Sequence, residues 1–389
     1  MNDVCRLGII GVGQRGLAFV RMALNTPGVE LTALCDKSAS RLREFAAQSN
    51  CTHVPQYTDM EEMLNRAAID AVVITVPDFM HAEAATAALR HGKHIMLEKP
   101  MAPTVAECRQ ILAARTDKSR IIQLGFVLRE HPVYRKAREV VSSGRLGQIM
   151  SAAADESIGV MHGASYMRRW HRKVANSGGF VLAKCSHDLD ILYWIIGSKP
   201  VKVASFGDCN FFRPEKQRAT HCSCCPDQSC RFRFQGEMVV MTEQEKSAPA
   251  GNNFDLCVYN SDKDVVDNQV VILEYANGVR ATFSLNLFAP EAKRTLKIVG
   301  TEGYLEADDV SCRVTVTSST GGEPEVYECR SGNNSGHGGS DRLFFDEFIH
   351  CVRTGAEPKA DFEAGLLATM VGNAIEQARV SGQTVAIYS

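Results

Sequence analysis

The chain lacks the long apolar runs, the basic leader and the excess of positive charge that would point to a membrane, an export route or a nucleic acid. No window of its 389 residues approaches the about 18 consecutive apolar residues that a membrane-spanning helix needs. No basic segment followed by an apolar stretch opens the chain, so we expect a cytoplasmic protein. Lysine and arginine number 43 against 45 acidic residues, which leaves a net charge of −2. We therefore expect neither a membrane nor a nucleic acid as partner.

Internal repeats are also absent, and the composition is that of an ordinary folded protein. Hydrophobic residues make up 45% of the chain and charged residues 23%. At roughly 150 residues per domain, the length indicates two domains. The 14 cysteines mostly stand singly in apolar runs such as Ala33-Leu34-Cys35, where a reduced thiol is a small hydrophobic side chain. A disulfide framework is not indicated.

The first part of the chain alternates short apolar runs with helical stretches. The runs are residues 6–10, 30–35, 70–75, 94–97 and 120–123. Continuous apolar strands separated by helices of about 10–15 residues indicate βαβ units and a parallel sheet covered on both faces. We predict a doubly wound α/β domain, a Rossmann domain, over residues 1–126.

After about Phe126 the pattern changes to two helical stretches followed by many strand-like segments. Turn sequences such as Asn277-Gly278 and Glu302-Gly303 join pairs of these segments, which predicts a mostly antiparallel sheet. Helical patterns return at residues 341–352 and 362–379. We predict a second α/β domain with an open sheet over residues 127–389, whose last helices can pack back on the first domain.

A glycine-rich loop, Gly11-Val-Gly13-Gln-Arg-Gly16, directly follows the first strand run and opens a helical pattern. Glycines there permit a tight turn and close approach to a pyrophosphate, whose charge the free N–H groups of the helix start stabilise. Asp36 closes the second strand run 20 residues after Gly16, where a carboxylate can hold a ribose diol. Asp36 favours NAD over NADP because a 2′-phosphate would meet a carboxylate, although the adjacent Lys37 softens that preference.

The tripeptide Glu98-Lys99-Pro100 follows the strand run 94–97 and is more specific than the glycine loop. Together with Thr75-Val-Pro77…His81 and Gly92-Lys-His94, it resembles the Gfo/Idh/MocA oxidoreductase family. The resemblance extends over nearly the whole chain, including Gly144-Arg-Leu-Gly-Gln148. It implies a Rossmann domain and a second domain whose open sheet often forms homodimer or homotetramer contacts. It also implies sugar or cyclitol substrates and an NAD(P) cofactor.

The cofactor contacts are expected in the loops at the carboxyl ends of the first domain's strands. They are Gly11, Gly13, Gln14, Arg15, Gly16, Asp36, Lys37, Thr75, Pro77, His81 and Glu98. The family's catalytic lysine corresponds to Lys99. A lysine beside an oxidised nicotinamide would meet a like charge and partial desolvation, and both lower its pKa toward a range useful for proton transfer.

A second family motif corresponds to residues 177–190. Its histidine is matched by His187, but the position of its aspartate holds Ala183. Residues 184 and 187 share a helix face by i, i+3 spacing. We hypothesise that Lys184 replaces the missing aspartate as a ligand or proton partner of a substrate hydroxyl, with Lys99 and His187 in proton transfer. A buried structural role is the alternative for His187.

Aromatic and cationic side chains before this helix are candidates for a sugar pocket. They are Tyr166, Arg169, Trp170 and His171, for which an exposed charged turn is the alternative. The resemblance also places His337 and Asp341, in a glycine-flanked loop, near the substrate. Helix capping is the structural alternative for Asp341.

A cysteine cluster stands apart from the family pattern. Cys222, Cys225 and Cys230 have a spacing compatible with a zinc site, with His221, Cys209 or Cys224 as a fourth ligand. The missing second C-x-x-C pair leaves two alternatives, incidental thiols in a loop or a redox pair.

The combined patterns favour an NAD-dependent oxidoreductase that moves a hydride between a sugar or polyol carbon and nicotinamide. Two alternatives use the same features. The first is an NAD-dependent glycosidase that oxidises its substrate transiently and then eliminates the aglycone. The second is a non-catalytic dinucleotide-binding sensor, which the retained Lys99 and His187 disfavour.

Overall fold

The computed structural model describes residues 4–234, 253–330 and 337–387, and the chain divides into two compact units. Unit 1 contains Met1–Phe126 and Arg342–Leu366, and unit 2 contains Val127–Arg233, Asn253–Asp341 and Leu367–Ser389. Within the described ranges, no helix combines the length and the apolar composition that a bilayer crossing requires.

Unit 1 is built on a six-stranded parallel sheet in the order β3-β2-β1-β4-β5-β6. The strands are β1 (Cys5–Ile10), β2 (Val29–Cys35), β3 (Gln56–Tyr57), β4 (Ala71–Ile74), β5 (His94–Leu97) and β6 (Ile122–Leu124). Every apolar run expected from the sequence contains or overlaps one of these strands, and the predicted doubly wound domain is confirmed. The edge strand β3 was not predicted because two residues carry no periodic pattern.

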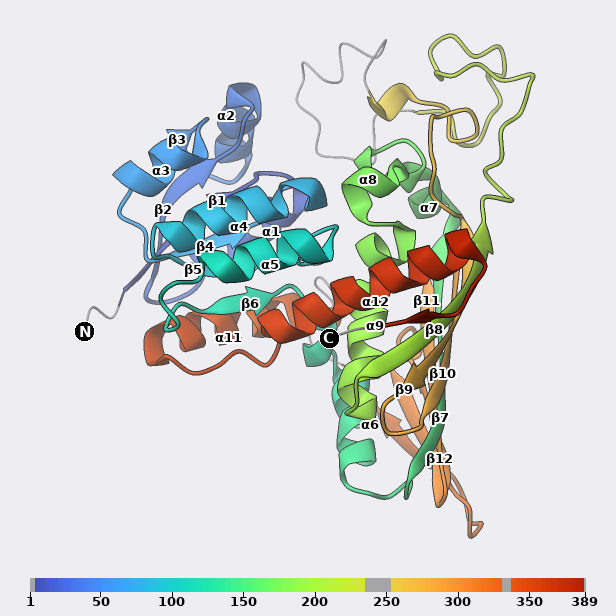
Figure 1. The fold of residues 1–389 in the computed structure, drawn as a ribbon. Coiled ribbons are helices and arrows are strands. Elements are labelled where there is room, and N and C mark those ends of the chain that lie inside the picture. Colours follow the sequence, from blue (N-terminus) through green and yellow to red (C-terminus); the bar gives the residue numbers. More distant parts are fainter. Residues whose placement is uncertain (1–3, 235–252, 331–336, 388–389) are drawn as a thin grey trace. The chain divides into compact units, whose positions relative to one another are not determined.

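Helices cover the sheet, and their starts follow from local sequence. They are α1 (Gln14–Leu24), α2 (Ala39–Gln48), α3 (Met60–Arg66), η1 (Asp78–Met80), α4 (His81–Arg90) and α5 (Val105–Ala114), with α4 and α5 side by side in Figure 1. Ser38 and Asp59 cap α2 and α3 with side-chain oxygens, and Thr104 caps α5 in a capping box with Glu107. The buried amide of Gln123 in β6 donates to the Phe344 carbonyl of α11 (Ser340–Thr354) at 2.9 Å, which joins the late segment to this sheet.

Unit 2 holds a nine-stranded sheet in the order β14-β13-β12-β11-β7-β10-β9-β8-β15. The strands are β7 (Ile149–Gly159), β8 (Pro200–Asp208), β9 (Asn268–Tyr275), β10 (Arg280–Ala289), β11 (Lys293–Gly300), β12 (Gly303–Asp308), β13 (Arg313–Ser318), β14 (Glu325–Glu328) and β15 (Val385–Ala386). Only the β7–β10 pair is parallel among the pairings of these strands. The predicted mostly antiparallel sheet is therefore confirmed.

One face of this sheet is covered by helices. They are α6 (Pro132–Ser142), α7 (Val160–Tyr166), α8 (Val174–Ser177), α9 (Phe180–Ile196) and α12 (Phe362–Ser381), with the 3₁₀ segments η2 (Val127–Glu130), η3 (Trp170–Arg172), η4 (Asn253–Asp255) and η5 (His337–Gly339) in the connections. In Figure 1, α6 and α9 lie along the strands, and α9 packs on both α6 and β7. The helix α9 is apolar on nearly every side and buried, so its few polar side chains lie inside the unit.

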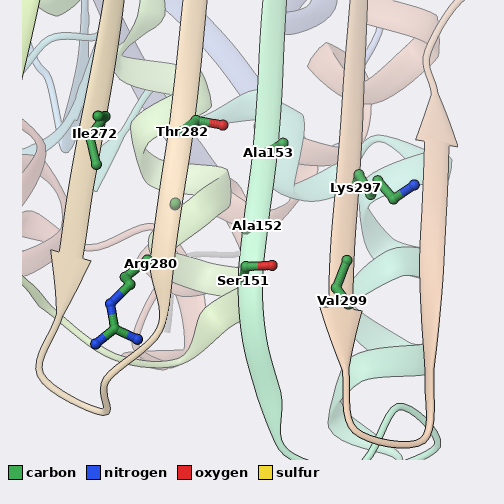
Figure 2. Close-up of a pocket in the computed structure, with 9 residues that line it drawn as sticks. Ser151, Ala152, Ala153, Ile272, Arg280, Thr282, Lys297 and Val299 are labelled. Atoms are coloured by element: carbon green, nitrogen blue, oxygen red, sulfur yellow. The ribbon is translucent and has the colours of Figure 1, made fainter.

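The opposite face of the sheet carries exposed apolar side chains. Phe206 of β8 and Val270 and Ile272 of β9 are exposed by 70%, 52% and 51%. Figure 2 shows Ile272 of β9, Thr282 of β10 and Lys297 of β11 on this face, with β7 between β10 and β11, around a shallow hollow of about 320 Å³. We name this surface, lined by Ser151, Ala153, Ile272, Arg280, Thr282, Lys297 and Val299, the outer sheet face.

A buried ion pair ties α9 to the start of unit 2. Asp190 of α9 accepts two hydrogen bonds from the guanidinium of Arg129, at 2.8 Å from Nε and 2.6 Å from NH2, and both side chains are buried. Removal of one partner would leave a buried charge without its bidentate counter-ion. We therefore expect Asp190→Ala to lower the free energy of unfolding by about 3–5 kcal/mol.

Urea denaturation followed by circular dichroism measures this cost. The control is Glu306→Ala, which removes an exposed pair with Lys297 and is expected to change the same quantity by less than about 1 kcal/mol. Equal effects of the two substitutions would contradict the assignment of Asp190 as a packing and charge-balancing residue.

Candidate active site

The three glycines of the loop between β1 and α1 have three different physical roles. Gly11 has a φ of +94°, and a Cβ there would lie 2.8 Å from the backbone of Thr75. A Cβ on Gly16 would lie 2.3 Å from the carbonyl oxygen of Gly11, so this glycine permits α1 to pack against the strand end. Gly13 has an ordinary φ of −81° and no heavy atom within 4 Å of a built Cβ. The open space beside Gly13, at the start of a helix, is where a pyrophosphate can approach the backbone.

The carboxylate of Asp36 lies at the mouth of this loop. It accepts hydrogen bonds from the backbone N–H of Val12 at 3.1 Å and of Ser38 at 3.0 Å. Lys37 is exposed beside it. The geometry fits a carboxylate that holds a ribose diol next to a bound pyrophosphate.

Thr75 and His81 hold the backbone around the loop. The Thr75 hydroxyl donates to the Gly11 carbonyl at 2.6 Å. His81 has no exposed surface, and its Nδ1 and Nε2 lie 2.7 Å and 3.0 Å from the carbonyl oxygens of Pro100 and Val76. Because both ring nitrogens contact backbone, His81 orients the segments at Val76 and Pro100. Pro77 stands in the first of these segments.

Lys99 stands two residues after the end of β5, at the carboxyl edge where the glycine loop and Asp36 also lie. The Arg15 guanidinium contacts Glu98 Oε1 at 2.7 Å from Nε and 2.6 Å from NH2. The other oxygen of Glu98 accepts from the Lys99 backbone N–H at 3.2 Å. A Cβ on Gly125 would lie 2.9 Å from the backbone nitrogen of Lys99. Unit 1 thus brings Gly11, Gly13, Arg15, Asp36, Thr75, Glu98 and Lys99 to one edge of its sheet, where ligands bind in doubly wound folds.

In unit 2, His187 of α9 belongs to a group of three histidines. It is 4% exposed, and its ring centroid lies 5.8 Å from that of His337. His337 has a φ of +46° and its Nδ1 lies 3.1 Å from Asp341 Oδ1. His131 lies close to this loop, since a Cβ built on Gly338 would be 3.0 Å from Nε2 of His131. Burial and then the neighbouring His337 lower the pKa of His131 to about 4.

The predicted pocket-wall residues form an aromatic cluster in the same unit. The buried Tyr166 ring lies edge-on to His171, at 4.5 Å, and to Phe180, at 4.9 Å. Trp170 stacks on His171 with ring centroids 3.5 Å apart. Arg169 is half-buried beside them. Tyr166 and His171 are only 8% and 9% exposed, so they do not belong to an exposed charged turn.

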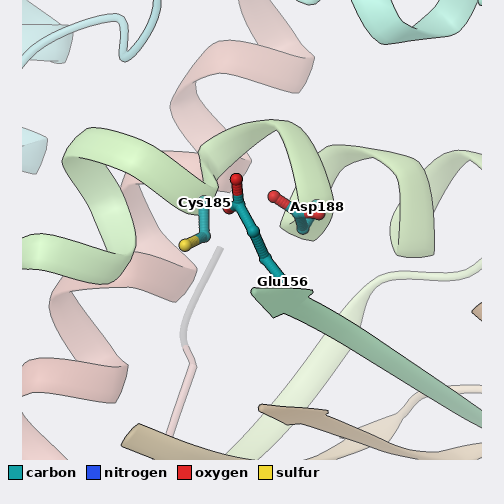
Figure 3. Close-up of side chains that lie close together, drawn as sticks. All are labelled: Glu156, Cys185 and Asp188. Carbon is teal, nitrogen blue, oxygen red and sulfur yellow. The ribbon is translucent and has the colours of Figure 1, made fainter. Parts of the chain in front are cut away.

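Glu156 of β7 and Cys185 and Asp188 of α9 lie together in unit 2 (Figure 3). They form the one group of at least three metal-ligand side chains, within the described ranges, whose ligand atoms lie within 4.8 Å of one another. Burial raises the pKa of the Cys185 thiol well above its usual range, which keeps it protonated.

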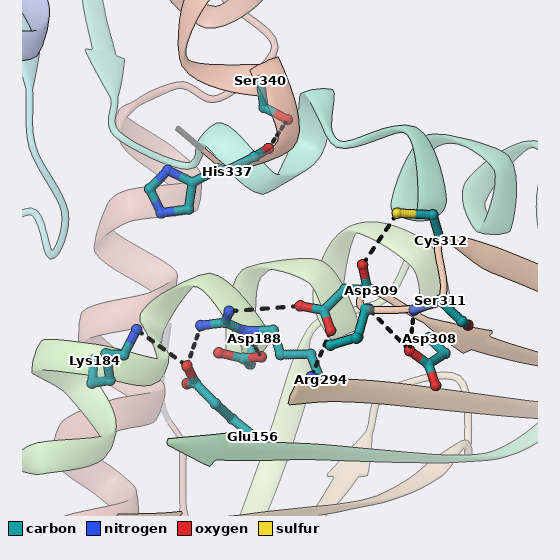
Figure 4. Close-up of polar contacts among 11 residues, drawn as sticks. Glu156, Lys184, Asp188, Arg294, Asp308, Asp309, Ser311, Cys312, His337 and Ser340 are labelled. Carbon is teal, nitrogen blue, oxygen red and sulfur yellow. Dashed lines mark hydrogen bonds and ion pairs between the residues drawn. The ribbon is translucent and has the colours of Figure 1, made fainter. Parts of the chain in front are cut away.

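Two cations already bind these carboxylates (Figure 4). The Lys184 ammonium lies 3.2 Å from Glu156 Oε1, and Arg294 of β11 contacts that same oxygen through NH2. The Nε of Arg294 donates to Asp188 Oδ1 at 3.0 Å. Because lysine and arginine occupy the acidic groups, the cluster does not have the donor set of a metal site.

The Lys184 side chain is an ammonium in this environment. Burial alone would lower its pKa, but the carboxylate of Glu156 outweighs burial and raises it. Lys184 is therefore a hydrogen-bond donor and a positive charge at neutral pH, not a base.

Glu156 and Arg294 were not predicted from the sequence. They are opposite one another in the β7–β11 pairing. Glu156 shares the buried alternation of Ala154 and Ile158 in β7, and Arg294 shares that of Leu296 in β11. A charged residue at a buried position of a strand was the signal that could have found them.

The cysteine loop does not assemble a metal site among the described residues. Cys222, Cys225 and Cys230 do not form a group within 4.8 Å. Backbone hydrogen bonds pair the segment at Cys222 with that at Cys257. The Cys222 N–H donates to the Asp255 carbonyl at 2.7 Å, and the Cys257 N–H donates to the Thr220 carbonyl at 2.8 Å. Zinc stays an unsupported prediction, and Cys257 is a nearby thiol that the sequence did not single out.

Comparison with known proteins agrees with this geometry. The family model described as "Oxidoreductase family, NAD-binding Rossmann fold" matches residues 5–126, and that of the family's C-terminal alpha/beta domain matches residues 138–387. The fold and the glycine loop define an NAD-binding oxidoreductase. The chain belongs to the Gfo/Idh/MocA oxidoreductase family, whose two matched regions together cover most of its length.

Several relatives are similar to this chain over half or more of its length. YteT of Bacillus subtilis strain 168, a protein named as an oxidoreductase, is 25% identical over 382 residues, 88% of each chain. Inositol 2-dehydrogenase of Salmonella typhimurium strain LT2 is 29% identical over 202 residues, which is 51% of this chain and 57% of that enzyme. The chain thus spans little more than half the length of such inositol dehydrogenases. A levoglucosan dehydrogenase solved with NADH and levoglucosan has the same fold, with a TM-score of 0.78, 18% identity and coverage of 99% of this chain and 100% of that one.

The different roles of Gly13 and Gly16 give a matched test of the cofactor loop. We expect Gly13→Ala to leave the Tm within about 2 °C of wild type, because its Cβ enters open space, while affinity for NADH falls about tenfold. NADH fluorescence titration and thermal unfolding measure the two quantities.

Gly16→Ala is the contrast variant. Its Cβ would meet the Gly11 carbonyl, so both Tm and NADH affinity are expected to fall. Unchanged NADH binding by Gly13→Ala would show that the cofactor does not approach this loop.

Proposed function

We propose that this protein transfers a hydride between NAD and the hydroxyl-bearing carbon of a sugar or polyol. The observation that carries the proposal is Lys99, which leaves β5 at the same edge of the sheet as the NAD-binding loop. The inositol and levoglucosan dehydrogenases among its relatives support the substrate class. Asp36 at the mouth of the loop supports NAD over NADP, because a carboxylate repels a 2′-phosphate.

The proposed chemistry gives three side chains different roles at the substrate hydroxyl. Lys99 takes the proton from the substrate hydroxyl, and His187 holds or relays it at the same oxygen. Lys184 donates a hydrogen bond to a substrate oxygen, since Glu156 keeps it an ammonium. When bound, the nicotinamide ring accepts the hydride.

The remaining pocket residues orient the sugar. Tyr166, His171 and Trp170 offer aromatic faces, while Arg169, His337 and Asp341 offer hydrogen-bonding groups. Sugar sites combine apolar ring faces with a few fixed polar groups, and this set has both.

We also propose that copies of the chain associate through the outer sheet face into a homodimer or homotetramer. The exposed Phe206, Val270 and Ile272 support this, since apolar side chains gathered on one surface are typical of protein interfaces.

A direct assay separates this function from its alternatives. We expect purified protein with NAD to form NADH in a 1:1 ratio with oxidised product when given an active member of a panel of cyclitols, monosaccharides and anhydrosugars. Absorbance and product analysis measure the ratio. Release of nitrophenol from nitrophenyl glycosides with no net NADH would indicate a glycosidase, and binding of NADH with no turnover of either substrate set would indicate a sensor.

Substitution of the two lysines tests their roles. Lys99→Met is expected to lower kcat by about 10²–10⁴-fold, and Lys184→Met by about 10-fold or more, the range for removal of acid–base and oxygen-binding groups. The affinity for NADH is expected to change little for Lys184→Met.

The control is Lys216→Met, which removes an exposed lysine of unit 2 and should leave kcat unchanged. Wild-type kinetics in Lys184→Met would end the hypothesis that this lysine replaces the family aspartate.

A further inference from the structure

Five charged side chains from the sheet and helix α9 of unit 2 form one buried network. Arg294 is its centre, because it contacts Glu156 and Asp188 and lies 4.0 Å from Asp309. Its backbone N–H also donates to Asp309 at 2.8 Å. Lys184 joins the network through Glu156 Oε1 (Figure 4).

Two carboxylate oxygens in the network have no hydrogen-bond partner. Oε2 of Glu156 and Oδ2 of Asp188 are both fully buried without a well-formed hydrogen bond, although the Cys185 thiol interacts with the Glu156 carboxylate. Both residues keep their first oxygen on Arg294, and the two carboxyl groups approach one another within 4.8 Å. Two buried acceptors in that position are both satisfied by a single proton held between them.

The charge balance of the network favours the same proton. The network holds two cations, Lys184 and Arg294, and three carboxyl groups, Glu156, Asp188 and Asp309. With every carboxyl group ionised, the network would carry one net negative charge, which costs free energy because Glu156 and Asp188 are buried and the Asp309 side chain is only 20% exposed. One bound proton makes the network neutral.

We propose that Glu156 and Asp188 share one proton and that this carboxyl pair, fixed by Arg294, positions the Lys184 ammonium. Glu156 and Arg294 are positioning residues, whereas Lys184 is the group that meets the substrate oxygen. The catalytic consequence rests on the proposed function, while the shared proton does not.

The electrostatics assign the proton to Asp188. Its pKa is raised to about 8, chiefly by burial, with Arg294 opposing and Glu156 adding to the rise. Burial also acts to raise the pKa of Glu156, but Arg294 and Lys184 outweigh it and hold that pKa below its usual range. At neutral pH the pair therefore holds an ionised Glu156 that accepts from a protonated Asp188.

The surroundings contain the other groups that a titration must include. They are Lys184 and Cys185 on α9, Arg294 on β11, Asp309 after β12 and Tyr134 on α6. Tyr134 is buried and interacts electrostatically with all three carboxyl groups. Burial raises the pKa of both Cys185 and Tyr134 well above their usual ranges. Neither of these two loses a proton as Asp188 titrates, but burial also raises the pKa of Asp309, so Asp188 and Asp309 are the two carboxyl groups that the Asp188→Asn variant distinguishes.

Loss of the proton changes what holds Lys184. An ionised Asp188 adds an uncompensated negative charge beside Glu156, which draws the ammonium into the network and away from a substrate oxygen. Activity should then fall as the pH rises through about 8.

The variant Asp188→Asn tests the proposal, because the amide keeps a neutral donor at the same place. For wild type we expect kcat at pH 9 to be about 10-fold below its value at pH 7, and for Asp188→Asn the ratio should change by less than about twofold. KM for NAD should be unaffected in both, since the network lies outside the Rossmann unit. The control, Glu328→Gln, removes an exposed arginine-bound carboxylate of unit 2 and should keep the wild-type ratio.

A second measurement needs no activity. The infrared carbonyl band of a buried carboxylic acid should be present at pH 7, titrate with a midpoint near pH 8 and be absent in Asp188→Asn. The folded state then binds a proton that the unfolded state releases near its ordinary pKa of 3.8, so this contribution to stability is complete below pH 4 and is lost as the pH rises to about 8. The Tm of wild type should fall more between pH 5 and pH 8 than the Tm of Asp188→Asn.

Should Asp188→Asn fail to fold, Glu156→Gln serves in its place, because loss of either carboxyl group removes the shared proton and its infrared titration. Absence of a protonated carboxyl band in wild type at pH 7 would overturn the proposal. So would a stoichiometric divalent metal that disappears in Asp188→Asn. A normal band together with no dehydrogenase activity would instead contradict only the proposed function.

Discussion

The second unit depends on one buried guanidinium. Arg294 enters from β11 and contacts a carboxylate on β7 and another on α9, so a single side chain fixes two strands and the helix that carries His187. Burial of charges is costly, and it is tolerated only where each charge meets its counter-charge with good geometry. This requirement sets the position of α9 on the sheet, and with it the face on which Lys184 and His187 lie.

In the first unit, the shape of the cofactor loop depends first on its backbone. Its glycine loop is shaped by close contacts at Gly11 and Gly16, and the space at Gly13 is left open between them. Side chains then hold this edge of the sheet together, as Thr75 bonds the loop and Arg15 bonds Glu98 beside Lys99. His81 likewise holds the backbone of this edge, through the carbonyl oxygens of Pro100 and Val76.

The sequence predicted what local patterns encode. Apolar runs predicted the parallel strands, and the order of strand, glycine loop, helix and Asp36 predicted the nucleotide edge, since these signals lie within a few dozen residues. Glu156 and Arg294 are 138 positions apart, and their contact arises from the antiparallel pairing of β7 with β11. The approach of His337 to His187 likewise depends on a long connection. Neither contact has a local periodic signal, although the charge at a buried strand position was visible in each strand.

The buried network accounts for an apolar residue at position 183 next to a lysine at position 184. The family pattern has a carboxylate at the position of Ala183, which here is 3% exposed and apolar, and the neighbouring charge is the opposite one, Lys184. A lone buried ammonium would lose its proton or destabilise the helix. Glu156 supplies a negative charge to Lys184 from the neighbouring strand β7, at 3.2 Å. Because Glu156 also binds Arg294, the proposed network would tie the charge of Lys184 to the protonation of Asp188.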